Sequence, residues 1–204
     1  MVVSADMVVD DSALAESYRV LRSRLDLSEL PPLTRAVTEA VLCATADFAF
    51  VTDLMCDEAI LAAGVRAIAA GVPVLADAPM VAAGITDCPV ICKAAESLAV
   101  RLARTTGITV PAAGVRLGFG VAGPGSVWVV GDAPDALREI LRRVTEPALV
   151  IGVPAGFSGA AEAKDELRAS GVPALTTLSE KGGPVVAVAA FHALLRAARG
   201  EPAP

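Results

Sequence analysis

The sequence predicts an α/β fold with three layers: a parallel sheet flanked by helices on both faces, preceded by a helical N-terminal segment. Two observations lead to this prediction. From residue 72 onward, short β-rich runs alternate with helical patterns. These runs are apolar on both faces, as expected for strands buried within a parallel sheet. Since the 204 residues contain no repeat and no linker, we expect one domain over residues 1–204.

Three helices are predicted in the first third of the chain. The first covers residues 12–25, where Leu and Tyr recur at helical spacing. The second begins at the proline pair 31–32, which suits a first helical turn, and ends by Asp47. The third covers residues 57–71, with acidic residues in its first turn and Gly71, a common C-terminal cap, at its end.

The β-rich runs predict five strands and the place of a ligand site. The predicted strands are 72–78, 88–93, 126–132, 148–154 and 173–178. Each crossover between parallel strands is expected to be right-handed, and ligands in such folds bind beyond the carboxyl ends of the strands. The turns at these ends are rich in Gly and Pro and lead directly into helices, whose N-terminal amides favour anionic groups. We therefore expect a ligand rich in carboxylates or phosphates.

Composition excludes several classes of partner. The formal net charge is −6 and no basic cluster is present, so the chain is not expected to bind nucleic acid. The longest apolar runs are short and interrupted by Gly and Pro, which predicts no membrane span. The first residues, MVVSADMVVDD, lack the basic start and apolar run of a signal peptide. A cytoplasmic protein is expected.

The cysteines do not form a metal-binding pattern. Cys43, Cys56, Cys88 and Cys92 include no C-x-x-C pair. The single histidine, His192, lies a hundred residues further along the chain, whereas a structural zinc ion needs about four ligands. We expect no metal and interpret the thiols as reduced and mostly buried.

Three short features each have a functional and a purely structural interpretation. The segment GFGVAG, residues 118–123, matches G-x-G-x-x-G, but a strand follows it instead of a helix, which favours a closely packed glycine-rich helix over a dinucleotide site. His192 lies within an apolar helix, where we interpret it as a surface or interface residue. EKGG, residues 180–183, is either an anion-binding helix N-terminus that includes Lys181 or a solvated turn.

The order of several stretches resembles a known family. These stretches are AESYRVLRSRLDLSELPPLTRAVTEAVLCATADF, VPVLADAPMVAAGI, VVGDAPDAL, ALVIGVPAGFSGAAEAKDELRASGVPALT and EKGGPVVAVAA, which lie between about residues 12 and 198. They resemble the precorrin-8X methylmutase (precorrin isomerase) family of cobalamin biosynthesis. The resemblance implies an α/β homodimer without a cofactor. It also implies an isomerase that converts precorrin-8X, or a cobalt analogue, to hydrogenobyrinic acid by moving a methyl group between adjacent carbons of pyrrole ring C.

The resemblance implies a catalytic position. In the family, the second helix ends in an H-A-[TS]-A-D-like segment, whose histidine is taken as the acid that protonates the ring. The chain has Cys43 at that position. A general acid works best when its pKa is near the operating pH; imidazole, at about 6.5, satisfies this better than a thiol at about 8.5. Efficient catalysis by the thiol is therefore not expected.

Two cationic positions also depart from the family pattern. Pro79 stands where the family commonly has the arginine of D-x-R-M-V, and Val110 where it has the arginine of T-R-S-A-A. Arg116 lies one helical turn beyond the latter segment and is a candidate partial substitute. These additional changes argue against a single designed substitution at Cys43. The candidate substrate-binding residues are Ser17, Thr45, Asp47, Asp77, Met80, Arg116, Gly156, Phe157, Glu162, Lys164, Lys181, Gly182 and Gly183.

Three functional hypotheses follow from the resemblance and its departures. The first is a divergent methylmutase-type isomerase with Cys43 at the acid position. The second is a homologue that binds a corrinoid or other tetrapyrrole without isomerising it. The third is an interaction role in which the homodimer serves as a partner or regulator in a biosynthetic cluster.

Overall fold

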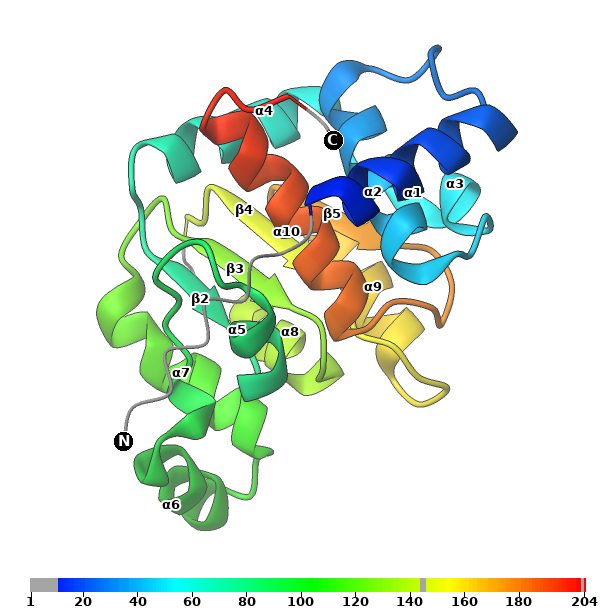
Figure 1. Cartoon of the computed structure of the whole chain (residues 1–204). Helices are drawn as coiled ribbons and strands as arrows, with labels where there is room; N and C mark the ends of the chain where they lie inside the picture. Colours follow the sequence, from blue (N-terminus) through cyan, green and yellow to red (C-terminus); the bar gives the residue numbers. More distant parts are fainter. Residues whose placement is uncertain (1–10, 144–145, 203) are drawn as a thin grey trace, which may run out of the picture.

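The structure is a computed structural model that describes residues 11–143, 146–202 and 204 (Figure 1). Residues 1–10, on which the expectation of no signal peptide depends, lie outside the described part. Five strands form one sheet in the order β1-β5-β4-β3-β2. The strands are β1 (Leu54–Met55), β2 (Val74–Ala76), β3 (Val127–Val130), β4 (Leu149–Gly152) and β5 (Ala174–Thr177).

The sheet is parallel from β2 to β5, whereas the short edge strand β1 pairs antiparallel with β5. Because β2, β3, β4 and β5 are neighbours in both sequence and space, their connecting helices lie mainly on one face. The predicted mixed α/β fold with helices on both faces is confirmed. The antiparallel edge was not predicted, since two residues give no periodic pattern.

Alternating side chains bury both faces of the sheet. In β3, Val127 and Val129 belong to one apolar core, and Trp128 and Val130 to the core on the opposite face. β2 and β4 alternate in the same way. Strands that are apolar on both sides therefore require a helical layer on each side, which explains the pattern seen in the sequence.

One face is covered by helices that connect the parallel strands (Figure 1). The other face is covered by helices from both ends of the described chain. The first group is α7 (Val110–Ala122), α8 (Pro134–Leu141) and α9 (Ala160–Ala169), with α6 (Ser97–Thr106) packed on α7. The second is α2 (Pro32–Thr45), α4 (Glu58–Ala69), α5 (Pro79–Gly84) and α10 (Pro184–Ala198), with α1 (Asp11–Arg24) and α3 (Phe50–Asp53) packed on α2.

The prediction of a strand over residues 88–93 is wrong. Of this segment only Ile91 joins the sheet, through a single bridge to Leu75, and a short 3₁₀ helix, η1 (Lys93–Ala95), follows. Pro89 has no amide hydrogen to contribute to a ladder, which limits pairing at this edge. The three predicted N-terminal helices and the other four predicted strands are present, each shorter than or shifted from its predicted range by a few residues at most.

GFGVAG lies within α7 and not in a strand–turn–helix unit, so the prediction of a closely packed glycine-rich helix is confirmed. A Cβ atom at Gly118 would lie 3.0 Å from side-chain atoms of both Leu75 and Trp128. The glycine therefore lets α7 approach the sheet closely.

Two other glycines of α7 allow a matched test of this packing. A Cβ atom at Gly114 would lie 2.5 Å from the backbone nitrogen of Ala94, whereas one at Gly120 would meet nothing within 4 Å. We expect Gly114→Ala to lower the free energy of unfolding by about 1 to 3 kcal/mol through overpacking. Gly120→Ala should raise it by up to about 1 kcal/mol, because alanine is the better helix former. Urea unfolding followed by circular dichroism measures both, and equal effects would contradict the packing argument.

Candidate functional site

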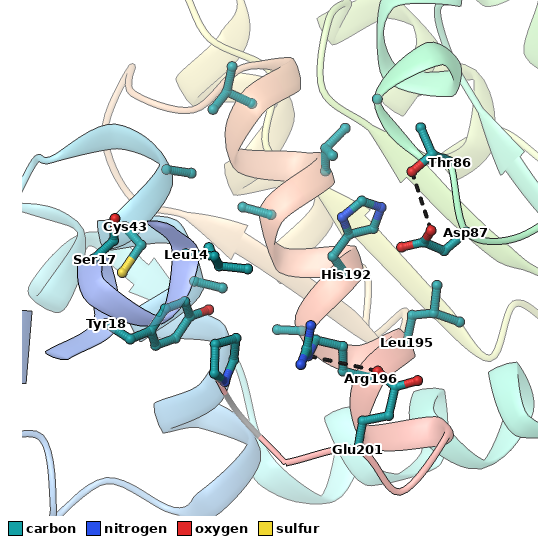
Figure 2. A pocket seen from close by; sticks show the side chains of 18 of the residues that line it. Leu14, Ser17, Tyr18, Cys43, Thr86, Asp87, His192, Leu195, Arg196 and Glu201 are labelled. Atoms are coloured by element: carbon teal, nitrogen blue, oxygen red, sulfur yellow. Dashed lines mark hydrogen bonds and ion pairs between the residues drawn. The ribbon is translucent and has the colours of Figure 1, made fainter. Parts of the chain in front are cut away.

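An open cavity of about 700 Å³ lies along the outer side of α10 (Figure 2). Its walls come from α1, α2, α10, Met80 and Gly84 of α5 with the segment after them, and the C-terminal end of the described chain. Most of the lining is apolar. The polar and titratable groups on the walls are Ser17, Tyr18, Cys43, Thr86, Asp87, His192, Arg196, Arg199 and Glu201.

Helical periodicity divides α10 between the core and the cavity. Apolar residues such as Ala187, Phe191 and Leu194 are buried in the core beneath the helix. His192 and Arg196 lie one turn apart on the cavity side, and Arg199 follows at the end of the helix. The same helix thus covers the sheet and supplies the cavity with a row of nitrogen-bearing side chains.

Cys43 lies in the last turn of α2 and is half-buried at the cavity wall. Burial raises the pKa of its thiol, Glu39 raises it further, and the Arg22 guanidinium acts in the opposite direction. The thiol is therefore protonated at neutral pH. It is a weaker proton donor than an ordinary cysteine, and much weaker than an imidazolium ion.

His192 lies across the cavity from Cys43 (Figure 2). Its Nε2 atom is buried and has no hydrogen-bond partner among the residues that the structure describes. Burial lowers the pKa of the imidazole from its ordinary value of 6.5; Asp87 opposes this effect, while Arg199 and Arg196 add to it. The sequence interpretation placed His192 at a surface or interface and did not identify the cavity. The four-residue spacing of His192 and Arg196 is the one signal in the sequence that places both side chains on the same face of a helix.

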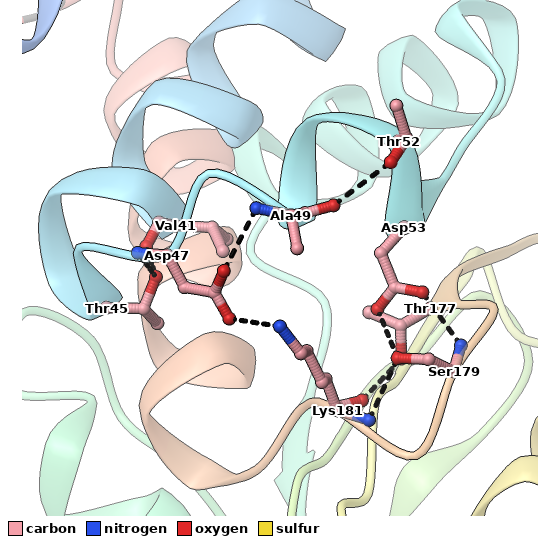
Figure 3. Close-up of polar contacts among 9 residues, drawn as sticks. All are labelled: Val41, Thr45, Asp47, Ala49, Thr52, Asp53, Thr177, Ser179 and Lys181. Carbon is pink, nitrogen blue, oxygen red and sulfur yellow. Dashed lines mark hydrogen bonds and ion pairs between the residues drawn. The ribbon is translucent and has the colours of Figure 1, made fainter.

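A second group of polar contacts lies where α2 meets the connection between β5 and α10 (Figure 3). The Lys181 ammonium is 2.5 Å from the Asp47 carboxylate. Asp53 accepts hydrogen bonds of 2.8 Å from the backbone N–H and the hydroxyl of Ser179. Thr45 donates its hydroxyl to the Val41 carbonyl. These contacts hold the segment before α10 against the ends of α2 and α3.

Lys164 is fully buried beneath that segment. Its ammonium group donates to the Thr177 hydroxyl at 2.8 Å, to the Lys181 carbonyl at 2.9 Å and to the Ser179 carbonyl. Burial lowers its pKa to about 8. All three donor positions are directed at protein oxygens, so Lys164 holds the β5–α10 connection in place.

Asp77 has a comparable place at the end of β2. Its buried carboxylate accepts hydrogen bonds from the backbone N–H groups of Gly131 at 3.2 Å and of Asp132 and Ala133 at 2.9 Å each. Burial raises its pKa to about 6, although these three hydrogen bonds act in the opposite direction. Asp77 thereby fixes the turn between β3 and α8.

Arg116 lies on α7, on the opposite face of the sheet from α10 and the cavity, and is not among the residues that line the cavity. Its guanidinium forms a pair of hydrogen bonds with the buried Glu139 carboxylate, at 2.7 and 3.1 Å. The residue is therefore held between α7 and α8.

The structure brings only some of the candidate residues together. Ser17, Cys43 and Met80 line the cavity, and Lys181, Gly182 and Gly183 lie in the segment that leads into its wall at Pro184. Phe157, Glu162 and Gly156 are exposed near the carboxyl ends of the strands. Gly182 has φ of +149°, and a Cβ atom there would collide with the Val153 carbonyl oxygen, so this position requires glycine.

Comparison with known proteins shows one family throughout. A family model described as precorrin-8X methylmutase matches residues 13–197. The cobalt-precorrin-8 methylmutase of Methanocaldococcus jannaschii is 34% identical over 181 residues, which cover 87% of this chain and 86% of the relative. The precorrin-8X methylmutase of Pseudomonas aeruginosa is 35% identical over 202 residues, covering 93% and 97%. A solved precorrin-8X methylmutase from Thermus thermophilus superimposes with a TM-score of 0.86 at 31% identity, covering 95% of this chain and 100% of that one.

The fold, the cavity and these likenesses define an α/β isomerase. The chain belongs to the precorrin-8X methylmutase family, which acts in cobalamin biosynthesis. Among the helices of the described residues, none is long and apolar enough to cross a membrane.

Lys164 of α9 and Lys181 of the β5–α10 connection allow a test of how that connection is held. We expect Lys164→Met to lower the free energy of unfolding by about 1 to 3 kcal/mol, because buried oxygen atoms lose their donor. Lys181→Met removes an exposed ion pair, which contributes little, and should leave the unfolding midpoint close to that of the wild type. Urea unfolding measures both. A larger loss for Lys181→Met would contradict the positioning role of Lys164.

Proposed function

We propose that this chain isomerises precorrin-8X, or its cobalt-containing form, to hydrogenobyrinic acid or the cobalt analogue by moving a methyl group between adjacent carbons of pyrrole ring C, without a cofactor. The observation that carries the proposal is the family match over residues 13–197, which includes most of the residues that line the cavity. Relatives with this activity in their names align over most of their own length.

The cavity supports the proposal by its size and chemistry. A volume of about 700 Å³ and a mostly apolar wall suit a large organic ring. Arg196 on α10 and Arg199 directly after it place guanidinium groups at the cavity wall, where they can pair with carboxylates of the ring. In the free protein these groups lie 3.9 and 3.8 Å from the Glu201 carboxylate. A local row of cations of this kind lets a chain with net charge −6 bind an anionic substrate without a basic patch.

The roles of single residues belong to the same proposal. Cys43 occupies the position that the family resemblance assigns to the acid, and its protonated thiol borders the cavity. Ser17 and Met80 contribute to the substrate-binding wall. Asp47 and Lys181 join α2 to the segment before α10 and thereby set the width of the cavity.

Incubation with precorrin-8X, followed by the change in absorbance, tests the proposed reaction. We expect the wild type to form hydrogenobyrinic acid. Binding of the tetrapyrrole without conversion would favour the alternative of a non-isomerising binding protein. Absence of both binding and conversion would refute the tetrapyrrole site itself.

Cys43→His tests whether position 43 faces the reacting ring. An imidazole has a pKa closer to the operating pH than a thiol has, so we expect kcat to rise by about tenfold or more. The measurement is kcat at saturating substrate, with product affinity as the control for an intact cavity. Unchanged kcat with unchanged affinity would show that position 43 does not transfer the proton.

We also propose that the protein is cytoplasmic, that each chain forms one domain over residues 1–204, and that two chains form a homodimer. It is supported by exposed apolar side chains near the carboxyl ends of the strands, among them Met80, Phe157 and Val185; Phe157 is 100% exposed. Large apolar side chains left exposed at one edge of a sheet are candidates for an interaction surface.

Phe157→Asp tests the dimer. We expect it to shift the molar mass in light scattering from twice the chain mass of 20.6 kDa toward one chain. Val121→Asp, on exposed apolar surface of α7 on the opposite face, is the control and should leave the mass unchanged. A wild type of one chain mass at micromolar concentration would refute the dimer.

A further inference from the structure

Two residues on the cavity side of α10 each have one buried side-chain nitrogen without a hydrogen bond to any described residue. Among the described residues, the buried side-chain nitrogen and oxygen atoms without a hydrogen-bond partner are His192 Nε2 and Arg196 Nε. Both residues lie on the cavity side of α10. Buried polar atoms are nearly always paired in folded proteins, and an unpaired one calls for an explanation such as a catalytic role or a bound water or ion. Together with the cavity beside it, the unpaired imidazole nitrogen is an observation about α10 that does not depend on sequence resemblance.

His192 is the single imidazole of the chain, and it lies across the same cavity from Cys43 (Figure 2). The cavity therefore retains one group suited to proton transfer near neutral pH, on the opposite wall from the position where the family has it. A ring bound between α2 and α10 would contact both walls.

We propose that His192 is the catalytic proton donor of this chain and has taken over from α10 the role that the family resemblance assigns to position 43. The proposal rests on the proposed isomerase function. In the complex the imidazole turns so that Nε2, which is buried in the free protein, faces the cavity. The imidazolium Nε2–H bond breaks and a bond from that hydrogen to the tetrapyrrole ring forms, leaving a neutral imidazole. The methyl group then migrates to the adjacent carbon with its bonding electron pair, and the ring returns the proton to His192. No atom or electron is gained or lost, as an isomerisation requires.

The charges around His192 explain how the donor becomes protonated. The charged and titratable groups around it in the cavity are Asp87 after α5, Arg196 on α10, Arg199 and Glu201 after α10, and the neutral Cys43 and Tyr18 of α2 and α1. In the free protein, burial and the two guanidinium groups hold its pKa below 6.5. Substrate carboxylates paired with these arginines add negative charge to the cavity and favour the imidazolium ion. The donor is therefore charged mainly in the complex.

This arrangement predicts a specific pH dependence. A general acid is active in its protonated form, so both kinetic parameters fall as the pH rises through the pKa of His192. kcat/KM reports the free enzyme and should fall through a pKa below 6.5, whereas kcat reports the complex and should fall through a higher one. Equal midpoints for the two parameters would overturn the substrate-linked protonation.

His192→Gln tests the donor directly, since glutamine retains a polar nitrogen but cannot transfer the proton. We expect kcat for precorrin-8X to fall by about 10²- to 10⁴-fold, with affinity for hydrogenobyrinic acid within about threefold of the wild type. The loss should exceed that of Cys43→Ser by at least tenfold. In the His192→Gln background, Cys43→His should recover at least tenfold in kcat. Retained kcat in His192→Gln, or a loss of product affinity that matches the loss of kcat, overturns the proposal.

A measurement without mutation separates this proposal from the isomerase function. Because the chain has one histidine, its imidazole signals in nuclear magnetic resonance are unambiguous. We expect the pKa of His192 to rise when hydrogenobyrinic acid binds, and an unchanged pKa in the complex overturns the donor role. Wild-type conversion with a fully active His192→Gln variant refutes the donor alone. Absence of wild-type conversion refutes the isomerase and the donor together.

Discussion

The buried ammonium group of Lys164 is the contact on which the cavity most depends. It gathers one hydroxyl and two carbonyl oxygens from the connection between β5 and α10, so the start of α10 has one position relative to the sheet. The Gly183 N–H donates to the Val153 carbonyl at 2.7 Å and ties the same connection to the end of β4. On the outer side, Lys181 and Asp47 join it to the end of α2. The two walls that carry His192 and Cys43 are thereby held relative to one another.

Sequence patterns predicted the sheet well because β2, β3 and β4 are buried on both faces and read as continuous apolar runs. The errors occur at the edges of the sheet. A two-residue antiparallel strand has no period to detect, and residues 88–93 look like a strand although Pro89 leaves only Ile91 to bridge to Leu75. Edge segments depend on neighbours distant in sequence, which periodicity does not report.

The candidate site was predicted less completely, for a similar reason. The cavity joins α1, α2, the end of α5 and α10, which no local pattern connects. Lys164 and Asp77 fit a family pattern, but only the structure shows that their charged groups form hydrogen bonds with backbone atoms. Pro79 and Val110, which the sequence resemblance assigns to arginine positions, begin α5 and α7. The cations that line the cavity are Arg196 of α10 and Arg199 directly after it.

The order of the strands along the chain has a consequence for folding during synthesis. Strands β2 to β5 and their connecting helices follow one another along the chain and complete one face of the sheet as they appear. The other face, with Val129 and Ile151, receives α10 only after all the strands exist. During synthesis on a ribosome, this face therefore lacks the part of its cover that α10 provides until that helix emerges. The cavity forms only once α10 is present, and a nascent chain has no place to hold the tetrapyrrole before then.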